Sequence, residues 1–311
     1  MVDVFLMIEV DGVTKKYGNV KVINDMSFKV GNGEVAVLFG PNGSGKTTML
    51  KSILGLLKFS GNIIVDGFDV KRKGKEVRRI ITYVPQQFSF YNNLNVIENM
   101  KFYADIRGIN REIFLERFEK LDLDNIANKR LGNLSEGLQQ KIMLATALLA
   151  DSPVLLFDEP TTNLDIKSIL ELKEIIKEYI KKGKTILLST HLLSQIKDIV
   201  SKVIVINQGK LLFEGHVDDL LERIGWSNRI ILTLQEELKP ELIDQIKELL
   251  SKVGVISVST EDKVMIVSSG TSNNISILKI IEEKGVSIKD IRIVEPNLEE
   301  EVFLKIIGEN K

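Results

Sequence analysis

The chain has 311 residues, of which 44% are hydrophobic, so it is long enough for about two domains with substantial cores. Its formal net charge is −1, and no basic run is interleaved with aromatic residues, which argues against nucleic acid as a partner. It contains no cysteine, which excludes disulfides, thiolate metal sites and a cysteine nucleophile. We expect no signal peptide and no membrane span, because no basic N-terminal segment is present and no apolar run reaches ~20 residues. Any membrane role would then depend on another chain.

Two stretches near the N-terminus, residues 8–13 and 20–30, alternate between apolar and polar residues, which predicts antiparallel strands. Tyr17 lies in the turn expected between them. Its side chain fits either ordinary aromatic packing or stacking on the base of a nucleotide. Residues 35–39 are all apolar and predict a buried strand.

A glycine-rich loop follows this strand and precedes a helical pattern. It fits Gly-x-x-x-x-Gly-Lys-Thr in the context that a phosphate-binding loop requires, although a tight glycine turn without a ligand is the alternative. Its backbone N–H groups and the helix N-terminus would bind phosphate oxygens. Lys46 would neutralise the outer phosphates, and the Thr47 hydroxyl would ligate Mg²⁺. The residues expected to contact the nucleotide are Gly40, Pro41, Asn42, Gly43, Ser44, Gly45, Lys46, Thr47 and Thr48.

Two further strands are predicted at residues 61–67 and 80–84, and the second ends before Pro85. Gln86 and Gln87 follow. An amide side chain at the carboxyl end of a strand lies where α/β sheets bind ligands, although a solvated loop glutamine is the commoner explanation.

From about residue 90 to residue 150 the apolar spacing becomes helical, which predicts an inserted helical subdomain. Ser135 is a candidate N-cap of its last helix, which carries the apolar run 142–150. The N-terminus of this helix is a second candidate anion site.

Two buried strands are predicted to deliver charged side chains to the same sheet edge. Residues 154–160 form an apolar strand that ends in Asp158 and Glu159, for which a helix-capping pair is the alternative. Residues 185–189 form another, followed by His191. Because ligands bind at the carboxyl ends of parallel strands, these groups would meet the phosphate-binding loop.

Together these residues predict phosphoryl transfer to water. Asp158 would hold Mg²⁺ with Thr47, and Glu159 is the candidate general base for a water in line with the γ-phosphate. His191 and Gln86 would position that phosphate and the water.

A strand hairpin at residues 203–206 and 210–213 closes the first predicted domain, residues 1–226. Residues 227–311 form a second domain, a small α+β unit with the split βαβ order and a final helix from near Asn297. Its strands and helices are expected at residues 229–234, 240–253, 255–259, 264–268, 274–284 and 288–294. The expected fold is α/β: a P-loop NTPase (RecA-like) core with an antiparallel β subdomain and the helical insert, followed by a βαββαβ, ferredoxin-like domain.

Over residues from about 8 to 225 the chain resembles the ATPase subunits of ATP-binding-cassette (ABC) transporters. The resemblance rests on motifs in the family's order: Tyr17 as the adenine-stacking aromatic, residues 40–48 as the Walker A loop, Gln86 as the Q-loop glutamine, residues 134–139 as the signature motif, residues 154–159 as the Walker B strand with the catalytic glutamate, Leu164 and Asp165 as the D-loop, and His191 as the switch histidine.

The signature motif departs from the family pattern Leu-Ser-Gly-Gly-Gln, since this chain has Glu136 in the third position and Leu138 in the fifth. Ser135 and Gly137 are retained, so anion binding is expected to persist, but Glu136 must point away from phosphate or weaken its binding by repulsion. Asn163 stands where related subunits commonly have glycine, and we draw no consequence from it.

The resemblance implies a site that needs ATP, Mg²⁺ and a second subunit. Thr47, Gln86 and Asp158 would be the metal ligands. Because the signature of one subunit faces the Walker A loop of another in this family, Ser135, Gly137 and Asp165 would complete the ATP site of a neighbouring subunit. A homodimer, or a close heterodimer, is therefore expected.

The resemblance also implies a separate membrane permease, contacted through the helical subdomain beside Gln86, with the chain bound to the cytoplasmic face of the cell membrane. Residues 295–304 are similar to the tails of drug-resistance and other type-2 exporter ATPases, which favours export over import. The alternatives are a soluble ABC ATPase that acts on ribosomes or DNA, and a module that binds ATP without turnover.

Overall fold

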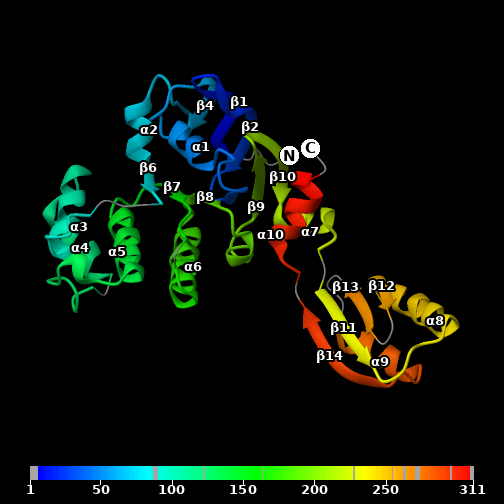
Figure 1. The fold of residues 1–311 in the computed structure, drawn as a ribbon. Helices are drawn as coiled ribbons and strands as arrows, with labels where there is room; N and C mark the ends of the chain where they lie inside the picture. The colour runs from blue at the N-terminus through cyan, green and yellow to red at the C-terminus, as the bar shows by residue number, and fades with distance from the viewer. Residues whose placement is uncertain are drawn as a thin grey trace. The chain divides into compact units, whose positions relative to one another are not determined.

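The computed structural model describes residues 6–86, 90–121, 123–162, 164–226, 228–253, 255–261, 264–269, 274–294 and 296–308. The chain divides into two compact units, Met1–Val217 and Asp218–Lys311 (Figure 1). This division lies upstream of the predicted boundary after residue 226. Helix α7 (Val217–Arg223) therefore falls in the second unit except for its first residue, and in this unit the Lys305 ammonium donates to the Ile224 carbonyl just after the helix. The assignment of residues 227–311 as a separate domain stays a prediction.

A mixed sheet forms the centre of the first unit. In sheet order its strands are β10 (Lys210–His216), β9 (Lys202–Asn207), β3 (Val35–Phe39), β8 (Thr185–Thr190), β7 (Val154–Asp158) and β6 (Ile81–Val84). All neighbouring pairs are parallel except β9 with β10. Strands β3, β7 and β8 are buried along their whole length, as expected of continuous apolar runs inside a parallel sheet.

An antiparallel sheet covers part of this core. Its order is β2 (Val20–Gly31), β1 (Leu6–Tyr17), β4 (Ser60–Val65) and β5 (Phe68–Asp69). Helix α1 (Lys46–Ile53) contributes Met49, Leu50 and Ile53 to the apolar core shared by the two sheets. Tyr17 is the last residue of β1, paired with Val20, so the expectation that it lies in the turn was wrong.

The predicted helical insert is present between β6 and β7, preceded by the short α2 (Gly74–Ile80). It contains α3 (Val96–Ile106), α4 (Arg111–Glu119), the 3₁₀ turn Leu131–Asn133 and α5 (Glu136–Leu148). These helices share a core of their own that includes Met100, Phe114, Phe118, Leu131 and Ile142. Helix α6 (Ile166–Lys181) follows β7 and begins after Asp165, whose side chain accepts a hydrogen bond from the Ser168 N–H.

The second unit contains α7, β11 (Asn228–Leu234), α8 (Pro240–Ser251), β12 (Val255–Glu261), β13 (Val264–Ser269), α9 (Asn274–Glu283), β14 (Ile288–Val294) and α10 (Leu298–Val302), followed by a π-helical turn, Phe303–Ile307. Its sheet has the order β12-β13-β11-β14, with each neighbouring pair antiparallel. Apolar residues of α8, α9, β11 and β13 form its core. Helix α10 follows its N-cap Asn297, which confirms the prediction of a final helix from near this residue. Within the described ranges, no helix is long and apolar enough to cross a bilayer.

Candidate functional site

The predicted phosphate-binding loop and two of the predicted catalytic residues line one pocket, of about 230 Å³. Its walls come from the loop between Asn42 and Thr48, from Gln86 after β6 and from Glu159 after β7, with Val22 of β2 at one side. Because β3, β6, β7 and β8 are parallel, the segments that leave their carboxyl ends meet at this edge of the sheet.

Two glycines of the loop have no room for a side chain. A Cβ atom on Gly40 would lie 2.2 Å from the Ile206 carbonyl oxygen, and one on Gly45 would lie 2.8 Å from the Val22 carbonyl oxygen. Gly45 also has φ +108°, a conformation that favours glycine. It is the N-cap of α1 and leaves that helix without a side-chain cap, so the helix N-terminus is open to an anion.

Lys46 makes a buried ion pair with Glu159. Its Nζ lies 3.1 Å from Glu159 Oε1, and both side chains are only 6% exposed. The ammonium also donates to the carbonyl oxygens of Gly40 at 2.7 Å and Pro41 at 3.1 Å. Lys46 therefore spans the distance from the phosphate-binding loop to the end of β7.

Glu159 has a left-handed backbone conformation, and both oxygens of its carboxylate have a partner. Its φ is +51°, and its N–H donates to the carbonyl oxygen of Ser189 at 3.1 Å and to the Ser189 hydroxyl at 3.0 Å. Its Oε2 lies 2.9 Å from Nδ1 of His191, whose side chain is one third exposed. The carboxylate is thus held between the Lys46 ammonium and the His191 imidazole.

Asp158 is buried and accepts three hydrogen bonds. The hydroxyls of Thr47 and Ser189 donate to its Oδ1 at 2.9 and 2.6 Å, and the Tyr83 hydroxyl donates to its Oδ2 at 3.1 Å. Burial, and then the nearby Asp158 carboxylate, raise the pKa of Tyr83, so the phenol keeps the proton that it donates.

The oxygen atoms available at this site fit a Mg²⁺ ion that takes only a few of its ligands from the protein. Thr47, on the first turn of α1, and Asp158, the last residue of β7, offer hard oxygens that are already hydrogen-bonded to each other. Within the part of the chain that the structure describes, no group of three or more His, Cys, Asp or Glu side chains could hold a metal ion by itself. Mg²⁺ commonly takes its remaining ligands from water and substrate phosphates, which suits this arrangement.

Comparison with known proteins identifies the family. Residues 23–162 match the model of the ABC transporter family. The chain is 37% identical over 209 residues to the ABC transporter ATP-binding protein NatA of Bacillus subtilis (strain 168), which covers 65% of this chain and 85% of NatA. It is 32% identical over 309 residues to the bacitracin transport ATP-binding protein BcrA of Bacillus licheniformis, which covers 97% of both chains. The chain belongs to the ABC transporter family.

A solved structure of the family has a similar fold. The dimeric post-hydrolysis state of the ATP-binding cassette MJ0796, bound to ADP and Pi, is 27% identical with a TM-score of 0.60, and the match covers 68% of this chain and 99% of that one. This ABC subunit is accordingly an ATPase whose hydrolysis of ATP is coupled to transport.

The remaining ABC motifs lie outside the pocket of their own chain. Ser135 is the N-cap residue of α5, as the sequence predicts, and it is exposed, but its hydroxyl makes no capping hydrogen bond. Gly137 is on the first turn of α5, where an added Cβ would lie 3.3 Å from Ser168 Oγ. Asp165 caps α6. Tyr17 is 49% exposed, with the Lys15 ammonium 4.7 Å from its ring centre.

Gln87, Asn163 and Glu295, the first residue of the exporter-like tail, lie outside the described residues. Tyr83 and Ser189, which both donate a hydrogen bond to Asp158, were not among the predicted site residues. The only signal for them is a hydroxyl near the carboxyl end of an otherwise apolar strand.

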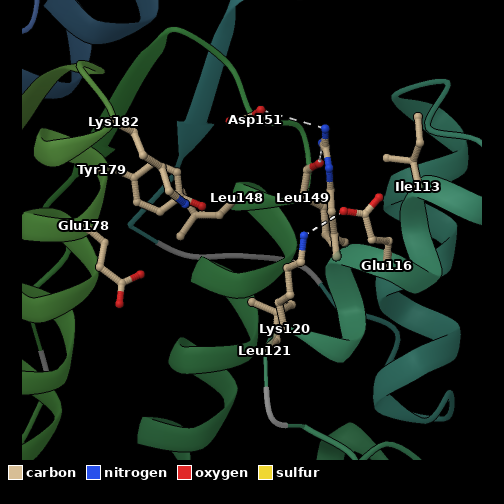
Figure 2. A pocket seen from close by; sticks show the side chains of 11 residues that line it. Ile113, Glu116, Lys120, Leu121, Leu148, Leu149, Asp151, Glu178, Tyr179 and Lys182 are labelled. Atoms are coloured by element: carbon tan, nitrogen blue, oxygen red, sulfur yellow. Dashed lines mark hydrogen bonds and ion pairs between the residues drawn. The ribbon is translucent and has the colours of Figure 1, made fainter.

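Another cavity, of about 400 Å³, lies beside α4, the end of α5 and α6 (Figure 2). Two ion pairs lie in its wall: Lys120 Nζ is 2.6 Å from Glu116, and Arg117 is 3.9 Å from Asp151. Burial, and then Asp151, raise the pKa of Tyr179 in its wall to about 12. None of the predicted site residues of the ABC subunit lines this cavity, so it is separate from the nucleotide pocket.

Proposed function

We propose that this chain powers export through a separate membrane permease, with Glu159 as the general base of ATP hydrolysis. The observation that carries this proposal is the position of the Glu159 carboxylate, between Lys46 and His191 and next to the Thr47–Asp158 pair. Similarity over nearly the full length to a bacitracin transport protein, together with an exporter-like C-terminal tail, favours export.

In this mechanism the nucleotide separates Lys46 from Glu159. The loop amides and the Lys46 ammonium bind the β- and γ-phosphates, and the freed carboxylate takes a proton from the attacking water. Mg²⁺, held by Thr47, Asp158 and Gln86, would neutralise charge on the phosphates. His191 stays within reach of Glu159 and orients it, and the products are ADP and phosphate.

The site is completed by a second subunit in this proposal. The exposed Ser135 at the start of α5, whose hydroxyl makes no capping hydrogen bond, would bind the γ-phosphate held by the neighbour's Walker A loop. Gly137 and Asp165 would lie at the same interface, and Tyr17 would stack on the adenine. The dimeric state of the cassette MJ0796 supports this arrangement.

We infer that the permease contacts an aromatic cluster near the Q-loop. Tyr91 and Phe102 are 48% and 37% exposed, and their rings lie edge to face with centroids 5.1 Å apart. Tyr103 extends the cluster at 5.4 Å from Phe102. Aromatic side chains, Tyr and Phe among them, are enriched at protein interfaces. Docking here would place the chain on the cytoplasmic face of the membrane.

We also propose that residues 227–311 form a ferredoxin-like domain. The order of helices and strands, βαββαβ, and the fully antiparallel sheet β12-β13-β11-β14 support this class.

Light scattering of the Glu159→Gln variant tests the proposal. With ATP and Mg²⁺ the variant should form a stable dimer, because ATP binds but hydrolysis cannot release it; with ADP it should not. Wild-type protein should release phosphate from ATP, which a module without turnover would not do. A Glu159→Gln chain that stays in its nucleotide-free state of association when ATP is added would refute the scheme.

The permease contact is tested separately by co-purification of a multispanning membrane protein from detergent-solubilised membranes. A Tyr91→Asp, Phe102→Asp variant should lose that protein while keeping ATP-driven dimerisation. Recovery of ribosomes or DNA instead would favour a soluble ABC ATPase.

A further inference from the structure

Strand β14 is an edge of the C-terminal sheet, since it is the last strand in the order β12-β13-β11-β14. It has seven residues, Ile288–Val294, and all but the first are exposed. An exposed edge strand presents unpaired backbone groups that can pair with another strand.

The apolar face of this sheet continues onto β14 without cover. Ile291 pairs with Leu232 of β11, and Ile293 pairs with Ile230. Paired residues share a face of the sheet. Ile230 and Leu232 are fully buried in the core with α8 and α9, whereas Ile291 and Ile293 are 44% and 56% exposed. Two isoleucines thus lie on the core side of the sheet but outside the core.

The backbone at the centre of β14 also faces the open edge. The Ile291 N–H donates to Oδ1 of Asp290, a side chain of its own strand, at 3.0 Å. In an antiparallel strand the N–H and C=O of one residue point to the same side. Ile291 therefore offers both groups to an incoming strand once the Asp290 carboxylate turns away.

The charges of β14 are complementary to those of a second, antiparallel β14. A two-fold axis at Ile291 places Asp290 opposite Arg292 of the partner subunit, and Arg292 opposite Asp290 of the partner subunit. The same axis brings the two Ile291 side chains together on the other face. Within one chain Arg292 Nε already lies 3.1 Å from Asp290 Oδ2, with the two side chains 75% and 48% exposed, so both charges are available.

We propose that the C-terminal units of two copies of this chain associate through β14, in antiparallel register about Ile291, without nucleotide. This interface goes beyond the ATP-dependent dimer proposed above and uses a different unit of the chain. One seven-residue strand from each copy makes a small interface, so the association is weak by itself. Its effect is to raise the effective concentration of one nucleotide-binding unit near the other.

We would measure this association by sedimentation velocity of the nucleotide-free chain in the presence of a chelator. Protein concentrations from about 1 to 200 μM cover the dissociation constants expected of small interfaces. Wild-type protein should shift from monomer toward dimer. Because of the two-fold axis, the variant Asp290→Arg or Arg292→Asp places like charges opposite one another at both symmetry-related contacts. Each variant should therefore weaken the dimer about tenfold or more. The double variant, with the charges exchanged, should restore it.

Mixing the two single variants gives a sharper result, because each now complements the other. A mixture should form dimers that neither variant forms alone. Glu261→Arg, on the opposite edge strand β12, is the matched control and should behave as wild type. A wild-type chain that stays monomeric over the whole range, or single charge reversals without effect, would overturn the proposal. ATP-driven dimerisation of Glu159→Gln tests a different surface, so either interface can fail without the other.

Discussion

Replacing Lys46 by Met removes the charge that neutralises Glu159 while keeping a side chain of similar length. At 3.1 Å and an effective dielectric constant of about 20, the attraction between the two charges is about 5 kcal/mol before the cost of desolvation. Because both side chains are buried, the variant leaves an anion whose remaining partner is His191. We expect the free energy of unfolding of the nucleotide-free chain to fall by about 3 kcal/mol.

Urea unfolding followed by far-UV circular dichroism measures this loss. Glu159→Gln should cost less, because the amide oxygen still accepts from Lys46. The Lys46→Met, Glu159→Gln double variant should be more stable than the sum of the single effects predicts, by about 1 to 3 kcal/mol. Strict additivity, or a Lys46→Met variant as stable as wild type, would refute the buried ion pair as the source of the effect.

Three further predictions concern Ser189, Glu136 and Asp165. Ser189→Ala removes a hydrogen bond to the Asp158 carboxylate and should lower stability by about 2 kcal/mol in urea unfolding, together with the rate of phosphate release; unchanged values would argue against Ser189 as a positioning residue. Glu136→Gln removes a negative charge from the start of α5 and should strengthen ATP-driven dimerisation of Glu159→Gln, as light scattering at graded ATP would show; weaker dimerisation would contradict it. Hydrogen bonds from Ser168 lower the pKa of Asp165, so its stabilising effect is present at neutral pH and lost as the pH falls through that pKa. The stability difference between wild type and Asp165→Ala should therefore shrink in acid, and a pH-independent difference would exclude this explanation.

The sequence predicts the pocket well where a residue lies within two positions of the end of a buried strand. Glu159 and Gln86 follow β7 and β6, and the parallel order of these strands is what brings them to the loop before α1. By contrast, Tyr83 and Ser189 act through pairing between strands distant in sequence, which residue spacing alone does not show.

Local geometry accounts for the other differences. Strand β1 reaches Tyr17 through several register irregularities, so its alternation of apolar and polar residues ends before the strand does. Ser135 is the N-cap residue that the sequence predicts, yet its hydroxyl makes no capping hydrogen bond, because N-cap preference describes a residue type and not a rotamer. The boundary between the two units lies upstream of the predicted boundary because its place depends on which unit α7 contacts. Such a tertiary contact has no local signature in the sequence.

The order of the central sheet has a consequence for how the molecule folds. Strand β3, which carries the phosphate-binding loop, is bonded to β8 in the register of Val35 with Ile186, whereas α3, α4 and α5 contact one another over short distances in sequence. Local contacts form early, and distant strand pairs must first close a long loop. We therefore expect the nucleotide pocket to be among the last parts to assemble. ATP, which needs the finished pocket, should slow unfolding while leaving the refolding rate nearly unchanged.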